Sequence, residues 1–240
     1  MKNQSDKTPL TPTEKSQFRS IVGQLNWLSG VTRPDISFEV SQLSAVASRA
    51  TVGDAKLLNK VVKKVHGEQL SISYPPLNLK SLSIVVYSDA SHGNLPDGGS
   101  QGGNIIFITD GTKSAPLQWT SQRLKRVVRS TLAAEALALL AACDSAIYLK
   151  TLVESTPNVT QLPAIKCIID NKSCYDNIFS SKPVLEQRLR IDIAAIREMV
   201  TRKEVTVVWK EKKHQLADCL TKRGANSQRL TECLKMGNIH

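Results

Sequence analysis

Residues 130–143, STLAAEALALLAAC, constrain the fold of this chain more than any other segment, because they place one charged residue, Glu135, among ten apolar neighbours. Their composition predicts a helix that begins after an N-cap at Ser130 and ends near Leu152. A helix that is apolar nearly all round is buried nearly all round, so the segment predicts a core helix. A lone carboxylate inside such a helix needs a cation or hydrogen-bond donors to offset its desolvation.

Runs of β-branched and apolar residues on both sides of this helix predict five strands. Three runs precede it and are separated by turn residues such as TDGT, which predicts an antiparallel meander. Two more runs follow it, and each returns to the sheet through helical segments. An alternating stretch, QLSISY, marks the start of the sheet-forming part. The predicted strands lie at 81–91, 102–111, 114–122, 164–170 and 204–209, and further helices at 172–179, 186–202 and from His214 onward.

This order predicts an α/β fold, in which a five-stranded mixed sheet is flanked by helices and preceded by a small helical segment. The helical segment contains three amphipathic helices. The first has an N-cap at Thr13, the second has Pro34 in its first turn, and the third ends at Gly67. The stretch before them is polar, contains two prolines and predicts a flexible lead. The predicted layout is 1–12 for the lead, 13–68 for the helical segment and 69–240 for the sheet domain.

Composition limits the partners and the compartment. The formal net charge of +11 favours polyanions, which include nucleic acid, anionic lipid and acidic protein. Five cysteines without a C-x-x-C pair argue against a disulfide framework and a zinc site. No apolar run reaches the roughly 18 residues of a membrane span, and the polar start has no signal-peptide core. We therefore expect an intracellular chain, cytoplasmic or nuclear, with no membrane partner.

Four carboxylates occupy positions that this topology brings to one edge of the sheet. Each also has a purely structural explanation. Asp89 could form a turn at a strand end, and Glu135 could pair with Arg129 or Lys125. Asp170 could be a helix N-cap, and Asp218 could stand in a first helical turn with Lys222 four residues on. The convergence of all four favours a shared site over four separate structural roles. The four residues are Asp89, Glu135, Asp170 and Asp218.

Carboxylates that lie within a few ångströms of one another repel, and their pKa values rise unless divalent cations neutralise them. Oxygen ligands favour Mg²⁺ or Mn²⁺ over zinc, and the sequence has no competing cluster of histidines or cysteines. Two such ions about 3.5 to 4 Å apart can activate a water and stabilise the leaving oxygen of a phosphodiester. The four acids therefore predict a site for two Mg²⁺ or Mn²⁺ ions.

A basic stretch, SQRLKRVVRS, lies immediately before the helix of Glu135. A solvated loop is the ordinary explanation of such a run, but its place beside the predicted site favours contacts with phosphates. Nearby polar side chains are candidate donors to a minor groove that displays 2′-hydroxyls. Trp119 and Trp209 are assigned to the core. The predicted nucleic-acid contacts are Arg123, Lys125, Arg126 and Arg129 for phosphates, and Ser121, Gln122, Ser130 and Asn171 for the groove.

Four motifs resemble, in order and spacing, the ribonuclease H domain of Ty1/copia-type retrotransposon Pol polyproteins: YSDASHG, QWTSQRLKRVVRSTLAAEALALLAACDSA, IIDNKSC and QLADCLTK. Upstream, FRSIVGQLNWLSGVTRPDISFEVSQLS resembles the segment that follows the reverse transcriptase palm in those polyproteins. The resemblance implies divalent-metal-dependent endonucleolytic cleavage of the RNA strand of an RNA/DNA hybrid. It also implies the polymerase palm as a partner. By the resemblance, Asp89 and Asp170 contact both ions, and Glu135 and Asp218 contact one each.

Two departures from the pattern keep alternatives open. The catalytic histidine loop of cellular ribonucleases H is replaced by the short WKEKKHQLAD, so His214 is the candidate for an auxiliary role. The chain also has no Tyr-x-Asp-Asp polymerase signature. The alternatives are a non-catalytic module that binds or tethers hybrids, and a transposase- or integrase-like nuclease of the same fold that cuts DNA.

Overall fold

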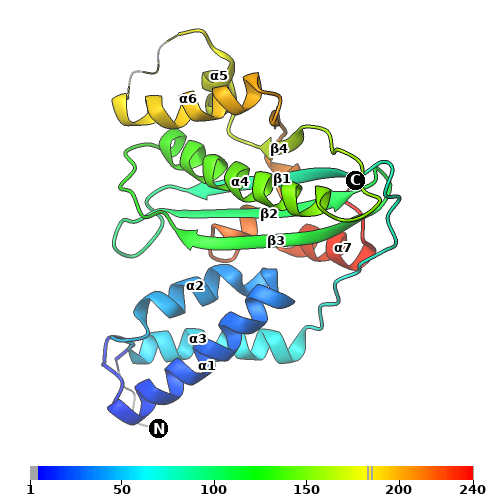
Figure 1. The fold of residues 1–240 in the computed structure, drawn as a ribbon. Coiled ribbons are helices and arrows are strands. Elements are labelled where there is room, and N and C mark those ends of the chain that lie inside the picture. The colour runs from blue at the N-terminus through cyan, green and yellow to red at the C-terminus, as the bar shows by residue number, and fades with distance from the viewer. Residues whose placement is uncertain (1–4, 183, 185, 240) are drawn as a thin grey trace. The chain divides into compact units, whose positions relative to one another are not determined.

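The computed structural model describes residues 5–182, 184 and 186–239, and the chain divides into two compact units (Figure 1). The first is Met1–Ser71 and the second is Ile72–His240. Each has its own cluster of buried apolar side chains, so each is described separately below. The assignment of the first unit to the end of a reverse transcriptase stays a prediction.

In its described residues, 5–71, the first unit contains three α-helices and one 3₁₀ turn. The first and third helices begin with capping boxes, in which Thr11 pairs with Glu14 and Thr51 with Asp54. The predicted N-cap at Thr13 is wrong, because Glu14 lies three residues after Thr11 and completes its box. Pro34 does open a turn, although it is a 3₁₀ turn before the second helix. The elements are α1 (Pro12–Val31), η1 (Pro34–Ile36), α2 (Ser37–Val46) and α3 (Val52–Gly67).

The second unit is built on a mixed sheet of five strands in the order β3-β2-β1-β4-β5. The first three strands form the predicted antiparallel meander. The last two join it in parallel, each after a helical crossover. This arrangement confirms the predicted ribonuclease H-like fold class. The strands are β1 (Ser83–Ser91), β2 (Gln101–Thr109), β3 (Ser114–Arg123), β4 (Ile165–Ile169) and β5 (Val205–Trp209).

The apolar helix predicted around Glu135 is α4 (Thr131–Glu154), and it packs along the sheet (Figure 1). Ser130 caps it as predicted, since its hydroxyl accepts a hydrogen bond from the Ala133 N–H. Small buried side chains such as Ala142 and Ala146 allow the helix to approach the strands closely. Helix α4 is also long and apolar enough to cross a membrane, although the sequence has no apolar run of that length without a charged residue. Half of its most apolar 18 residues are buried inside the protein, as in the core helix of a globular domain.

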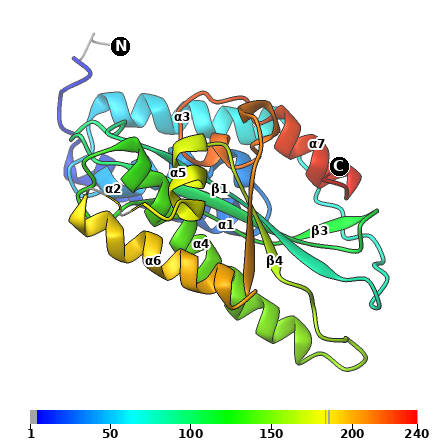
Figure 2. The ribbon, with the colours of Figure 1, turned by 90° about the horizontal axis from the view of Figure 1, so that it is seen from above.

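Two further helices cover the same side of the sheet as α4, and Figure 2 shows α5 and α6 beside it. The closing helix α7 lies near the opposite face, where its Arg229 and Cys233 act electrostatically on Tyr87 of β1. Two short 3₁₀ turns precede α7. The elements are α5 (Lys172–Phe179), α6 (Gln187–Thr201), η2 (Lys212–His214), η3 (Asp218–Leu220) and α7 (Gln228–Met236).

The alternating stretch 69–74 is not a strand, which corrects the sequence-based expectation. Its Ser73 N–H donates to the carbonyl of Leu234 in α7, so its main chain pairs with a helix end. Pro75 packs near Gly237, and Leu77 packs against the core of the sheet. The linker that leads into β1 is therefore part of the second unit from residue 72.

We expect the fragment Ile72–His240 to fold alone, because it contains a complete sheet core and the linker contacts. A fragment that starts at Ser81 should melt several degrees lower, since it loses the Leu77 packing and the Ser73 hydrogen bond. Thermal melts followed by circular dichroism check this. Equal melting temperatures of the two fragments, or an unfolded longer fragment, would contradict it.

Candidate active site

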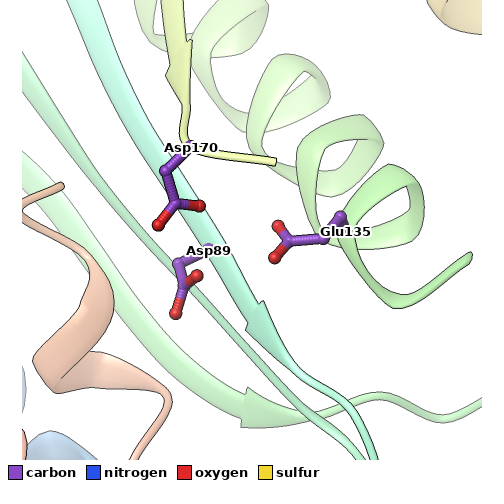
Figure 3. A group of neighbouring side chains, drawn as sticks. All are labelled: Asp89, Glu135 and Asp170. Atoms are coloured by element: carbon purple, nitrogen blue, oxygen red, sulfur yellow. The ribbon is translucent and has the colours of Figure 1, made fainter. Parts of the chain in front are cut away.

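Three of the four predicted carboxylates meet at the end of the central strands (Figure 3). Asp89 is near the C-terminal end of β1, Glu135 is in the second turn of α4, and Asp170 directly follows β4. One oxygen from each lies within 4.8 Å of the others. The parallel pairing of β1 with β4 brings the two aspartates to the same sheet edge.

Two carboxylate oxygens in this group are buried and have no hydrogen-bond partner among the described residues. They are Asp89 Oδ1 and Glu135 Oε2. The other Asp89 oxygen accepts a hydrogen bond from the Thr221 hydroxyl, and the Ala90 main chain hydrogen-bonds to Glu135. Because buried acceptors are nearly always satisfied, the two unpartnered oxygens mark a place for a ligand that interacts with oxygen.

Burial and mutual repulsion raise the pKa values of the three acids. Desolvation is the largest cause in each case. Repulsion by Asp89 and Asp170 adds to it for Glu135, whose pKa rises to about 9. The pKa of Asp89 rises to about 6, even though Lys222 and Thr221 oppose the shift. The pKa of Asp170 is also raised, partly by Asp218. The group therefore favours either extra protons or a bound cation.

The fourth acid, Asp218, stands at the start of η3 and is not among the three carboxylates that lie within 4.8 Å of one another. The ammonium of Lys222 lies between it and the group. Lys222 Nζ is 3.2 Å from Asp89 Oδ2 and hydrogen-bonds to Asp218. Asp218 still raises the pKa values of Asp89 and Asp170 through space. The structure thus places all four acids in one region, with a lysine between the fourth and Asp89.

The segment that carries Asp218 and Lys222 is fastened to the sheet by polar contacts. The Gln215 side chain donates to the Ser88 carbonyl at 2.9 Å. The hydroxyl of Ser121 donates to the Leu220 carbonyl at 2.5 Å and accepts from the Gln101 amide. The hydroxyl hydrogen of Ser121, which was predicted to contact the minor groove of nucleic acid, is therefore used in a hydrogen bond within the protein.

A cleft of about 340 Å³ opens above the acids. His92 and Thr131 line it beside the predicted residue Asn171. His92 was missed by the sequence analysis, although it lies three residues after Asp89 in the same motif. The predicted auxiliary residue His214 lies in η2, is half-buried and is not among the residues that line this cleft. Its pKa is lowered by desolvation and by nearby positive charges, foremost Arg229.

The four cations of the basic stretch before α4 are all exposed, and two of them form ion pairs within the protein. Arg123 forms an ion pair with Asp97, and Arg126 forms one with the buried Asp192 of α6. Lys125 and Arg129 are exposed. Arg126 therefore fastens the stretch to α6, whereas Lys125 and Arg129 form no ion pair within the described residues and are available to a polyanion.

The remaining predicted contacts have mixed placements. Gln122 is exposed at the end of β3, and Ser130 is the half-buried N-cap of α4. Asn171 caps α5, a role that the sequence analysis had given to Asp170. Trp209 is not a core residue, since 38 % of it is exposed and its indole N–H donates to the Asp170 carbonyl.

The residues present fit a divalent cation. The ligands are hard carboxylate oxygens, and the described part of the chain holds no histidine or cysteine within this group. One oxygen of each acid lies within 4.8 Å of the others, and a bound cation would give the two unpartnered oxygens a partner. Asp89, Glu135 and Asp170 would hold it. A cation there would lower the raised pKa values of these acids, so that they would be ionised near neutral pH.

Comparison with known proteins identifies relatives of the sequence. No family model matches the chain. It is 30% identical over 215 residues, or 88% of its length, to the "Retrovirus-related Pol polyprotein from transposon RE1" of Arabidopsis thaliana, and 30% identical over 87% of its length to the RE2 polyprotein of the same plant. The chain spans 14% of the length of each of these relatives.

Among solved structures, the N-terminal RNase H domain of a Mycobacterium tuberculosis protein aligns with 58% of this chain and 95% of its own length, at 18% identity and a TM-score of 0.45. The fold assignment rests on the strand order and pairing described above. The chain is therefore a homologue of one segment of the retrovirus-related Pol polyproteins of transposons, and its second unit has a ribonuclease H-like fold.

Proposed function

We propose that this chain is a ribonuclease H, which cuts the RNA strand of RNA/DNA hybrids endonucleolytically with the help of two divalent cations. The observation that carries the proposal is the cluster of two buried carboxylates and one half-buried carboxylate that lines a cleft and has two oxygens without a hydrogen-bond partner among the described residues. A buried acid cluster is costly to the fold, so its presence is best explained by a reaction that uses it.

Exposed positive charge and the homologous sequences both support a nucleic-acid substrate. The exposed cations Lys125 and Arg129 precede α4, whose N-terminal residue Thr131 lines the cleft, so they would hold a phosphate backbone near the acids. The relatives are Pol polyproteins of transposons, and the sequence motifs resemble the ribonuclease H domain of the Ty1/copia type. The motif resemblance implies an RNA/DNA hybrid, which is the proposed substrate, and the polymerase palm of the same polyprotein and a cytoplasmic particle are the proposed setting.

The roles of the chain's own residues follow from their positions. Bound divalent cations would supply Lewis acidity and an activated water. With those cations bound, Asp89, Glu135 and Asp170 would be ionised and would place negative charge at the reaction centre, and the burial of Glu135 limits its contact with bulk water. Asn171 and Thr131 at the cleft wall offer polar groups that orient the sugar–phosphate chain.

The substrate class is tested with four end-labelled duplex or single-stranded substrates in Mg²⁺: an RNA/DNA hybrid, double-stranded DNA, double-stranded RNA and single-stranded RNA. We expect cutting of the RNA strand of the hybrid alone. Cutting of plain double-stranded DNA would instead indicate a transposase- or integrase-like nuclease. Tight hybrid binding without any cutting would indicate a tethering module.

A further inference from the structure

Lys222 divides the acidic site into two chemically different halves. In one half, Asp89 Oδ1 and Glu135 Oε2 are buried, and no described residue offers either a hydrogen bond. In the other half, Asp89 Oδ2 accepts a hydrogen bond from Thr221 and lies 3.2 Å from the Lys222 ammonium, which also binds Asp218. In the described part of the chain no cation forms an ion pair with Glu135 or Asp170, whereas Asp89 and Asp218 share that of Lys222.

We propose that the Lys222 ammonium is a resident counter-cation, which occupies the space between Asp89 and Asp218 in the metal-free protein and must withdraw before a divalent ion can bind there. The inference rests on the proposed function, because it assigns an order of cation binding to the same site. The first divalent ion enters the half made by Asp89, Glu135 and Asp170, and the second binds only as Lys222 leaves.

Burial explains why a lysine stands in this place. The side chain of Asp89 is 1% exposed, so its charge would be strongly destabilising without a partner. Attraction to Asp89 and Asp218 in turn raises the pKa of Lys222 against the cost of its own desolvation. The ammonium therefore stays charged and stabilises Asp89 in the absence of metal.

The same geometry allows the lysine to leave. The Lys222 side chain is 32% exposed and lines the cleft, so its flexible stem can carry the ammonium into solvent. An ammonium and a divalent ion that share the two aspartates would repel each other at close range. Lys212, whose Nζ is 3.8 Å from Asp218, lines the same cleft but forms no ion pair with Asp89 among the described residues. Lys222 is therefore the residue that competes with a second ion.

The test measures cation binding to the full chain without nucleic acid, by titration calorimetry with MnCl₂, in the wild type, Lys222→Met and the control Lys150→Met. Lys150 is also partly buried, but it pairs with Glu154 far along α4 and does not line the cleft. We expect Lys222→Met to bind a second Mn²⁺ at least roughly tenfold more tightly than the wild type does, because the competing charge is gone. Lys150→Met should bind as the wild type does.

In EDTA, Lys222→Met should also melt at a lower temperature than the wild type, because Asp89 loses its partner. Unchanged or weaker Mn²⁺ binding by a folded Lys222→Met would overturn the proposal. If this variant does not fold, NMR of the wild-type ammonium groups decides. The Lys222 resonance, assigned by its loss in Lys222→Arg, should shift in saturating MgCl₂, and a resonance that stays in place would overturn the proposal.

These outcomes separate the inference from the proposed function. A chain that cuts no hybrid while Lys222→Met binds Mn²⁺ more tightly would refute the proposed function alone. A chain that cuts the RNA strand while Lys222→Met binds Mn²⁺ as the wild type does would refute the inference alone.

Discussion

Glu135→Gln should make the metal-free protein more stable and, at the same time, remove its nuclease activity. Desolvation and the neighbouring acids raise the pKa of Glu135 from 4.5 to about 9 in the folded state. The folded wild type therefore keeps a proton that the unfolded chain releases, and its stability falls as the pH rises from about 4.5 through about 9. The amide of glutamine has no proton to lose, so the variant lacks this dependence.

The expected effect of Glu135→Gln is a gain of about 1–3 kcal/mol in the free energy of unfolding at pH 8 in EDTA, and little change at pH 4. Urea denaturation at several pH values measures it. Added Mg²⁺ should stabilise the wild type and should stabilise the variant much less, since a ligand that binds only the folded state adds stability. Cleavage should drop by about a thousandfold or more, because a bound cation contributes several kcal/mol to the transition state.

The control for this prediction is Asp144→Asn, which removes an exposed carboxylate from the same helix. It should leave activity and the response to Mg²⁺ as in the wild type. A Glu135→Gln protein that is less stable than the wild type at pH 8 in EDTA would contradict the account, because it would mean that the carboxylate already has a satisfying partner.

Gly103→Ala should displace the segment that carries Asp218 and Lys222. Gly103 pairs with Asp89 across β1 and β2. A Cβ atom at this position would lie 2.7 Å from Leu220 Cβ and 2.9 Å from Thr221 Cγ2. These atoms are attached directly to the main chain or one bond from it, so the segment itself must move. We expect a loss of about 1–3 kcal/mol in stability, which is typical of overpacking.

The activity of Gly103→Ala should fall by about a hundredfold, because a displacement of about 1 Å near a reaction centre has an effect of this size. Gly102→Ala is the matched control. A Cβ at Gly102 would meet mainly the far end of the Leu124 side chain, which can rotate away. Equal activities and equal stabilities of the two variants would show that neither property depends on the close packing of residues 220–222 against β2.

Local patterns predicted much of this structure. The strands that form the sheet and the helix around Glu135 were predicted because their apolar periodicity is local and is reinforced by packing on one core. The stretch 69–74 was assigned wrongly because an alternating pattern cannot show whether a neighbouring strand offers hydrogen bonds or a helix end does. The same limit applies to Thr13, because Thr11, two residues earlier, forms the N-cap instead.

The interior of the site depended on contacts that a sequence does not display. Lys222 was predicted to pair with Asp218 one helical turn away, but its ion pair with Asp89 spans 133 residues. Arg126 was predicted to face phosphate, whereas its partner Asp192 lies 66 residues away on α6. Such pairs form only once the sheet and helices have brought distant segments together. The pair of Lys222 with Asp218, four residues apart, could therefore be predicted, but the ionic partners of Asp89 and Arg126 could not.

The most direct test of the central claim is cleavage of an end-labelled RNA/DNA hybrid by the wild type and Asp170→Asn, in Mg²⁺ and in EDTA. The substitution removes one of the three clustered carboxylates, and the Asp170 carbonyl keeps its hydrogen bond from Trp209. The account predicts that the wild type cuts only the RNA strand, only with Mg²⁺, and that Asp170→Asn is slower by about a thousandfold or more. Cleavage that persists in EDTA, or that Asp170→Asn retains in full, would contradict it.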